Sequence, residues 1–321
     1  MGLHIIKDNT NINFIGMRRV AYVVSGALIL LGLLSLVFKG GPRYGIDFAG
    51  GIVVQVKFHQ NVEVGEVKDS LKATTLPEVI VQRFGQDKDN EYLLRISSAD
   101  LEPGAVREEI AKVFDVSFKD KGYEMQRLEM VGPKVGSDLR NKAMEAMFYA
   151  VLLIAIYISG RFEQRWMAAA IMAAALAGIM YILGQFMALG YLTMAATLVA
   201  LLLCWRLKLN YALGAVVALV HDVMITVGVF SLLNKEFDLT IIAALLTIVG
   251  YSLNDTIIVF DRIRENLRAK IANTLGVTIN TSINQTLSRT LLTSGTTLVV
   301  IVCLYLFGGG VIHDFALSLL I

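Results

Sequence analysis

Residues 239–266 read LTIIAALLTIVGYSLNDTIIVFDRIREN, and this stretch decides the class of fold. Between residues 239 and 260 it is apolar except for one polar turn around Asn254 and Asp255, and charged residues follow only from Asp261 onward. A helix needs about 20 mostly apolar residues to cross a hydrocarbon core about 30 Å thick. The stretch therefore predicts a membrane-spanning helix over residues 239–260 that carries a carboxylate inside it.

Apolar runs of similar length recur along the 321-residue chain, of which 55% is hydrophobic and 17% charged. The charged share lies below the about 25% that is usual in soluble domains. The predicted spans are 20–38, 143–160, 166–187, 190–205, 211–233, 239–260 and 288–307. A further span begins near Phe315 and is cut off at Ile321, so we expect more sequence to follow. The sequence thus predicts a polytopic α-helical membrane protein with about eight transmembrane helices, the last one truncated.

Basic residues in the short connecting segments set the predicted orientation, because loops rich in Lys and Arg stay on the cytoplasmic side. With residues 1–19 in the cytoplasm, the cytoplasmic segments hold twelve Lys and Arg residues, and the short outer loops hold only Lys235. The first span is expected to be retained, because Lys39-Gly40-Gly41 is not a signal-peptide cleavage site. We expect a multi-pass inner-membrane protein with residues 20–38 as its first span, residues 39–142 outside the membrane (periplasmic or extracellular) and a transmembrane bundle over 143–321.

The outer segment predicts a small α+β domain. Its expected strands, rich in Val or alternating in polarity, are Gly51–Phe58, Val79–Phe84, Tyr92–Ile96 and Tyr123–Val131. Helical spacing over 61–76 and the position of Pro103, which suits the first turn of a helix, predict two helices between them. A turn is expected at Gly85-Gln86-Asp87. The order strand, helix, strand, strand, helix, strand is the ferredoxin-like arrangement.

The segment that leads into this domain reads Gly45-Ile-Asp-Phe-Ala-Gly-Gly51. Its glycines indicate a tight turn, because glycine adopts backbone conformations that other residues avoid. We expect Asp47 to hydrogen-bond backbone groups there, as most aspartates in turns do.

Asp222 lies in the middle of the predicted span 211–233, directly after His221. A charged carboxylate inside a membrane is costly, so such residues face the bundle interior, pair with other groups or change protonation state. Burial raises the pKa of an unpaired aspartate and favours its neutral form. Asp222 is therefore a candidate proton carrier with His221 as a supporting polar residue. The alternative is a carboxyl that only joins two helices through a hydrogen bond.

Asp255 is the second candidate. Ser252, Asn254 and Thr256 make its helical turn polar all round, which a lipid-facing helix does not tolerate. Tyr251 lies one turn before Asp255 on the same face. We expect Tyr251, Ser252 and Asn254 to support a buried carboxyl at Asp255.

Arg289 opens the predicted span 288–307, at a predicted depth close to that of Asp255. The two residues are expected to form a pair, which offsets the cost of burying both charges only when its geometry is good. A pair that breaks on protonation would act as a switch. The alternative is an arginine that only anchors the helix at the interface. Thr293, one turn further along, is expected to line a hydrated path or to tie helices together.

A charged motif follows the span 239–260 on the cytoplasmic side, and its residues are Asp261, Arg262, Arg264, Glu265 and Asn266. It continues into an amphipathic stretch that reaches about Asn284. Two interpretations stay open, an interfacial helix and a docking site for a cytoplasmic partner.

Other function classes find little support in the sequence. A net charge of +2 gives no reason to expect nucleic-acid binding. The chain has no GxxxxGK[ST] loop for ATP, no nucleophile–base set and no zinc-ligand spacing. Cys204 and Cys303 both lie in apolar runs and predict neither a disulfide nor a metal site. We therefore expect no enzyme activity, no cofactor and no metal.

Five motifs give the chain a resemblance to the SecF family of the resistance–nodulation–division superfamily. They are GIDFAGG at 45–51, VGPKVG at 131–136, LVHDV at 219–223, GYSLNDTIIVFDRIREN at 250–266 and LSRTLLTSGTT at 287–297. The resemblance implies a subunit that works with SecD beside the SecYEG channel and uses the proton motive force to help preproteins across the membrane. It implies SecD, SecYEG, translocating preproteins and membrane lipids as partners, and proton-pathway roles for Asp222, Asp255 and Arg289.

The chain departs from the family pattern in one place. SecF members are expected to have six helices, and residues 166–205 add a hairpin that brings the number to eight. Because two helices are added, the orientation of the following motifs is preserved. The alternatives are one half of a proton-coupled exporter of small molecules or lipids, and a scaffold in which the charges only hold helices together.

Overall fold

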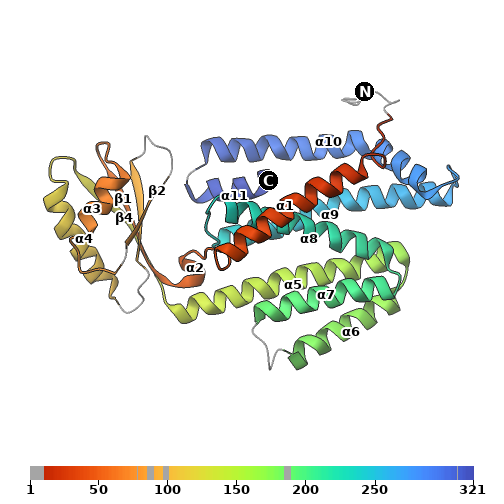
Figure 1. Cartoon of the computed structure of the whole chain (residues 1–321), viewed down its shortest axis with the longest axis horizontal. Coiled ribbons are helices and arrows are strands. Elements are labelled where there is room, and N and C mark those ends of the chain that lie inside the picture. Colours follow the sequence, from red (N-terminus) through yellow and green to blue (C-terminus); the bar gives the residue numbers. More distant parts are fainter. Residues whose placement is uncertain (1–10, 78, 85–89, 97–100, 184–188, 309) are drawn as a thin grey trace.

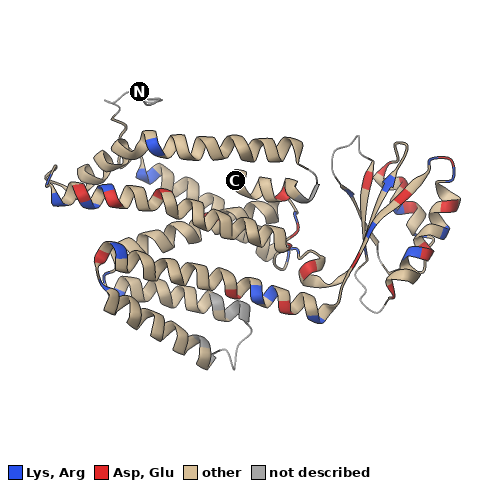
Figure 2. Ribbon diagram, turned by 180° about the vertical axis from the view of Figure 1, so that it is seen from behind, with Lys and Arg blue, Asp and Glu red and all other residues tan. Residues whose placement is uncertain are grey.

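The computed structural model describes residues 11–77, 79–84, 90–96, 101–183, 189–308 and 310–321. Figure 1 shows two parts: long helices that run side by side, and a small sheet with two helices that lies at one end of them. The charged residues are concentrated in the sheet part and at the ends of the long helices, whereas the middle of the bundle carries few of them (Figure 2). This is the distribution that a polytopic membrane protein requires.

The small part has the predicted order of elements. They are β1 (Gly51–Phe58), α3 (Val64–Leu71), β2 (Val79–Phe84), β3 (Glu91–Ile96), α4 (Pro103–Ser117) and β4 (Tyr123–Val131). The strands pair antiparallel in the order β2-β3-β1-β4, which confirms the ferredoxin-like arrangement. The turn expected at 85–87 lies outside the described residues.

One face of this sheet is apolar, because successive side chains of a strand point to opposite faces. Ile52, Val54, Val56 and Phe58 alternate along β1 and are buried against α3 and α4. The other face is partly polar and includes the ion pair Lys57–Glu91. The domain thus has one core, on the side of its two helices.

The long part consists of apolar helices that overlap the predicted spans. They are α1 (Arg18–Phe38), α5 (Pro133–Glu163), α6 (Trp166–Leu183), α7 (Leu189–Arg206), α8 (Asn210–Leu232), α9 (Leu239–Arg268), α10 (Leu275–Phe307) and α11 (Gly310–Leu320). Of these, α5, α9 and α10 are longer than predicted. Within the described residues, five of them (α1, α5, α8, α9 and α10) are long and apolar enough to cross a membrane. The predicted hairpin contains the shorter apolar stretches Trp166–Ile179 and Met194–Arg206, and α11 has 11 residues.

The hairpin α6–α7 packs on the outside of α5 and α8 and does not separate them. Figure 1 shows α6 and α7 at the edge of the bundle, next to α5. At its base, Glu163 Oε1 accepts a hydrogen bond from Tyr211 N at 2.8 Å, and Arg165 Nη1 donates to Leu207 O at 2.7 Å. The end of α5 therefore lies against the start of α8, beside the base of the hairpin.

Helices α1 and α8 cross at two glycines. A Cβ atom built on Gly32 would lie 2.6 Å from the Cα atom of Gly228. One turn further, Ser35 and Ser231 share a hydrogen bond of 2.8 Å. Small residues let the two backbones approach closely, as at many helix crossings in membranes.

The segment predicted as a glycine turn contains a short helix, α2 (Ile46–Ala49), before Gly50 at φ 77° and Gly51 at φ 127°. Asp47 hydrogen-bonds backbone as expected, since its Oδ2 accepts from Leu239 N at 3.0 Å. After β4 the chain enters α5 at Pro133 without a loop. The predicted domain boundary at residue 142 lies inside α5, whose first turns are polar.

Candidate functional site

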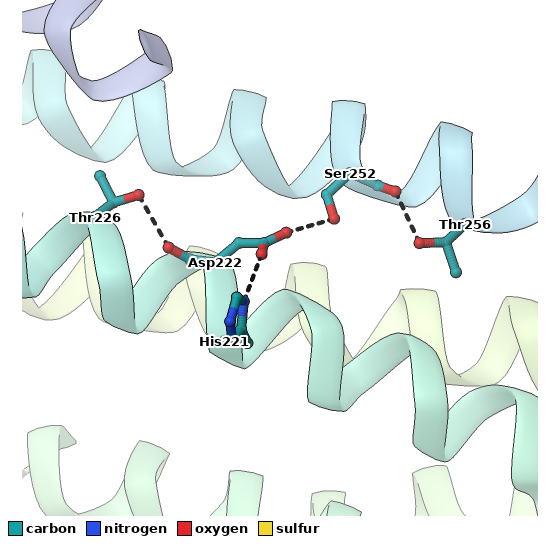
Figure 3. A network of polar contacts seen from close by, with 5 residues as sticks. All are labelled: His221, Asp222, Thr226, Ser252 and Thr256. Atoms are coloured by element: carbon teal, nitrogen blue, oxygen red, sulfur yellow. Dashed lines mark hydrogen bonds and ion pairs between the residues drawn. The ribbon is translucent and has the colours of Figure 1, made fainter. Parts of the chain in front are cut away.

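Asp222 lies at mid-length of α8 and faces α9. Its Oδ2 accepts a hydrogen bond of 2.6 Å from Ser252 Oγ of α9, and its Oδ1 lies 2.9 Å from His221 Nδ1 (Figure 3). Two threonines one turn further along each helix bond backbone: Thr226 donates to Asp222 O and Thr256 donates to Ser252 O, both at 2.9 Å. The carboxyl thus has a polar partner on each side within otherwise apolar helices.

This carboxyl is only partly enclosed by the chain. The Asp222 side chain is 33% exposed and the His221 ring 35%. Both protonation states of the carboxyl can keep the link to Ser252, because a hydroxyl donates to a carboxylate and also accepts from a carboxylic acid. His221 can likewise donate or accept at Nδ1, depending on its tautomer or charge.

Asp255 faces the opposite neighbour, α10. Its Oδ2 accepts a hydrogen bond of 2.8 Å from Ser294 Oγ, and the described residues contain no ion pair between Asp255 and Arg289. The predicted contact between these two residues is therefore wrong. Arg289 is exposed on α10.

The register of α9 and α10 explains the difference. The two hydrogen bonds Asp255–Ser294 and Asn266–Ser282 align the antiparallel helices at both levels. In this register Arg289 lies five residues from the partner of Asp255, or about 7.5 Å along the helix axis. The sequence prediction put Asp255 and Arg289 at similar depths because it took residue 260 as the end of one helix and residue 288 as the start of the next. In the structure α9 continues to Arg268 and α10 begins at Leu275.

The remaining predicted residues of this region lie on the surface of the chain. Tyr251 and Asn254 are exposed on α9, and Thr293 is exposed on α10. Thr293 Oγ1 donates to its own helix, at Arg289 O and Thr290 O. Exposed polar groups on apolar helices require water or another polar surface, since hydrocarbon offers no hydrogen-bond partner.

Helix α9 therefore stands between two carboxyl sites. Ser252 reaches Asp222 on α8, and Asp255, almost one turn later on α9, reaches Ser294 on α10. Each site joins a carboxyl of one helix to a hydroxyl of its neighbour. Protonation of either carboxyl removes its charge and can reverse the direction of the hydrogen bond between α9 and that neighbour.

The predicted cytoplasmic motif mostly fastens helices together. Asp261 forms an ion pair of 3.3 Å with Arg161 at the end of α5, and Arg264 Nη1 donates to Arg161 O at 2.9 Å. Asn266 is buried and donates to Ser282 Oγ at 2.8 Å and Gln285 Oε1 at 2.9 Å. The amphipathic stretch expected to reach Asn284 is not one helix, because α9 and α10 are separated by residues 269–274.

The other two motif residues pair on the surface. Arg262 and Glu265 form an exposed ion pair of 3.0 Å, one turn apart on α9. Such pairs contribute about 0–1 kcal/mol to stability.

Sequence reasoning missed two asparagines of α10. Asn284 exchanges two hydrogen bonds with the backbone of Ile12, of 2.8 and 2.9 Å, and Asn280 bonds Ile12 O and Ile15 N. The spacing of four residues, which puts both amides on one helical face, was the available signal. Among the described residues, no group of three or more His, Cys, Asp or Glu is placed to hold a metal ion.

Comparison with known proteins assigns the chain to a family. Residues 112–204 and 187–321 each match the family model of the protein export membrane protein SecD/SecF, C-terminal, and residues 35–62 match the SecD/SecF GG motif. The SecF protein translocase subunit of Desulfurispirillum indicum is 40% identical over 315 residues, which cover 97% of this chain and 85% of that protein. The chain belongs to the SecF family. The SecF subunit of Magnetococcus marinus is 41% identical over 321 residues, 99% of this chain and 88% of the relative.

A solved structure of the family has the same fold. The crystal structure of SecDF from Thermus thermophilus, described as a translocon-associated membrane protein, matches with a TM-score of 0.72 and 30% identity. The match covers all of this chain and 36% of the SecDF chain, so this chain corresponds to about a third of that longer one. The two matches to the SecD/SecF model overlap at residues 187–204, within the predicted additional hairpin.

Proposed function

We propose that this chain is the SecF subunit of a SecDF-type complex that uses the proton motive force to assist preprotein translocation through SecYEG. The observation that carries the proposal is the pair of carboxyl sites on either side of α9. Asp222 and Asp255 each bind a hydroxyl of a neighbouring apolar helix, at 2.6 and 2.8 Å. A proton that binds one of these carboxyls changes a link between two helices.

The membrane supplies enough energy for such a step. One elementary charge that crosses the membrane releases about 2.3 kcal/mol per 100 mV. Such an energy shifts a two-state equilibrium by well over tenfold. Arg289, about 7.5 Å along α10 from the partner of Asp255, is proposed to be a further charged group on the proton pathway.

SecD is proposed to cover the polar side of α9 and α10. Tyr251, Asn254 and Arg289 are exposed there on helices that are otherwise apolar. The SecDF chain of T. thermophilus is nearly three times as long as the part that this chain matches, which leaves room for a second membrane half. We propose an inner-membrane location with a cytoplasmic N-terminus and the sheet domain on the outside, on the basis of the twelve cytoplasmic Lys and Arg residues.

The test is preprotein translocation into inverted vesicles with and without a proton gradient. The variants Asp222→Asn, Asp255→Asn and Arg289→Met are compared with the wild type at equal membrane levels. Asp138→Asn, on an exposed polar turn of α5, is the matched control. We expect the three variants to lose the stimulation by the gradient and to keep translocation in its absence. Stimulation that persists in all three would make the carboxyl sites structural and favour the scaffold alternative.

A further inference from the structure

The outer turn between α8 and α9 is a meeting point of several segments. Lys235 forms an ion pair of 2.7 Å with Asp314 of α11. Phe237 exchanges backbone hydrogen bonds of 2.8 Å with Arg43 and Gly45, on the connection between α1 and the sheet. The turn is therefore held in place by the bundle and by the entrance to the sheet domain.

Glu236, in the same turn, reaches the sheet itself. Its carboxylate forms ion pairs with Arg95 of β3 and, at 3.4 Å, with Arg43. It also accepts a hydrogen bond of 3.2 Å from Gln82 Nε2 of β2. Its side chain is only 11% exposed, and a buried carboxylate that loses its partners is strongly destabilised. The buried Glu236 carboxylate therefore depends on its ion pairs with Arg95 and Arg43 and on its hydrogen bond from Gln82.

Glu236 contacts the side of the sheet that lies away from the covalent connections to the bundle. The strand order is β2-β3-β1-β4, and the chain enters and leaves the domain at β1 and β4, where Gly51 pairs with Val131. Covalent attachment to the bundle is therefore confined to one side of the sheet, whereas Glu236 binds the opposite side, β2 and β3. Gly50 and Gly51, at φ 77° and 127°, form the covalent attachment at β1.

The same turn connects α8 and α9, the two helices joined by the Asp222–Ser252 hydrogen bond. Asp222 lies 11 residues before Leu233 on α8, or about 16 Å along the axis, and Ser252 lies 14 residues after Asp238, or about 21 Å. Because helices are stiff over such lengths, a shift of α8 against α9 at the Asp222–Ser252 link would be carried to the turn that holds Glu236. Helices α8 and α9 and the turn between them thus connect the carboxyl sites to the β2–β3 side of the sheet, which has no covalent attachment to the bundle.

We propose that Glu236 is a positioning residue that holds the β2–β3 side of the sheet domain on the α8–α9 turn and so couples the acid-bearing helices to the position of the domain. The inference rests on the proposed proton-driven function. When Glu236 releases Arg95 and Gln82, the sheet is free to pivot about the attachment at β1 and β4.

The first measurement is a distance between spin labels at Lys68→Cys on α3 and Val135→Cys on α5, both exposed positions. The native Cys204 and Cys303 are replaced by alanine. We expect one narrow distance distribution for the wild type and a broad one for Glu236→Gln. Arg95→Met should broaden it as well, and the double variant should equal the single variants, because both remove the same contact. Glu129→Gln, which loses an exposed pair with Arg127 on β4, is the matched control and should stay narrow.

The second measurement is the gradient-dependent translocation assay on the same variants. We expect Glu236→Gln and Arg95→Met to lower the stimulation by about fivefold or more, and Glu129→Gln to leave it unchanged. A narrow distribution in Glu236→Gln overturns the positioning role, and a broad one with full stimulation overturns the coupling. If the wild type itself shows no stimulation, the proposed function and the coupling both fail, whereas the distances still decide whether Glu236 holds the sheet.

Discussion

The close crossing of α1 and α8 predicts how much stability is lost when a methyl group is added to Gly32. In Gly32→Ala, the added Cβ atom would lie 2.6 Å from the Cα atom of Gly228. Carbon atoms rest at about 3.5–4.0 Å from each other, so the helices must move apart by about 1 Å. Neither contact atom can rotate away, because the neighbour is backbone. Overpacking of this kind costs about 1–3 kcal/mol.

Gly26→Ala is the matched control in the same helix, since a Cβ atom there meets no described atom within 4 Å. Both substitutions gain the same helix propensity, about 0.5–1 kcal/mol, so their difference isolates the crossing. Thermal unfolding of the purified chain in detergent measures that difference as a shift in Tm, about 1.5 °C per kcal/mol for a chain of 321 residues. Equal midpoints for Gly32→Ala and Gly26→Ala would refute the close approach of the two backbones.

Three further predictions follow from single contacts. Asn266→Ala should lower the stability of the α9–α10 pair by about 1–3 kcal/mol, because it removes one buried and one partly buried hydrogen bond. Proteolysis of the 269–274 loop should accelerate, and unchanged cleavage would contradict this. Burial and the hydrogen bond to Asp115 raise the pKa of Tyr123 from 10.0 to about 12. The contribution of Tyr123 to stability is therefore complete below pH 10 and lost between pH 10 and about 12, and Tyr123→Phe should remove one late step from the tyrosinate absorbance titration. Deletion of residues 165–206 should leave the chain folded with an unchanged orientation of α8, which the accessibility of a cysteine at position 235 reports; a reversed accessibility would contradict it.

The sheet domain could be predicted well because its strands show their burial in the sequence. Alternation in Gly51–Phe58 and Tyr123–Val131 marks the buried face, and the structure has both strands at the predicted bounds. The start of α5 could not be found from hydropathy, since its first ten residues are polar. Pro133 at the first helical position was the signal for it.

Two carboxyls of the candidate site could be singled out from the sequence, but their partners could not. Asp222 and Asp255 stand out because an ionisable residue in an apolar helix is costly. The neighbour that each carboxyl contacts depends on how the helices are aligned along their axes. Polar extensions such as 261–268 change the predicted alignment, because hydropathy does not show that the helix continues through them. The partners Ser252 and Ser294 come from this register, and so does the distance between Asp255 and Arg289.

The base of the α6–α7 hairpin shows where a segment can be inserted between α5 and α8. Arg165 and Leu207 touch, so the two ends of the hairpin lie at one point of the surface, as the termini of an inserted domain do. A segment that leaves and returns at one point does not force the flanking helices apart. The junction of α5 and α8 is therefore a natural graft site, where a fluorescent or affinity module could replace the hairpin and report on the bundle from its periphery.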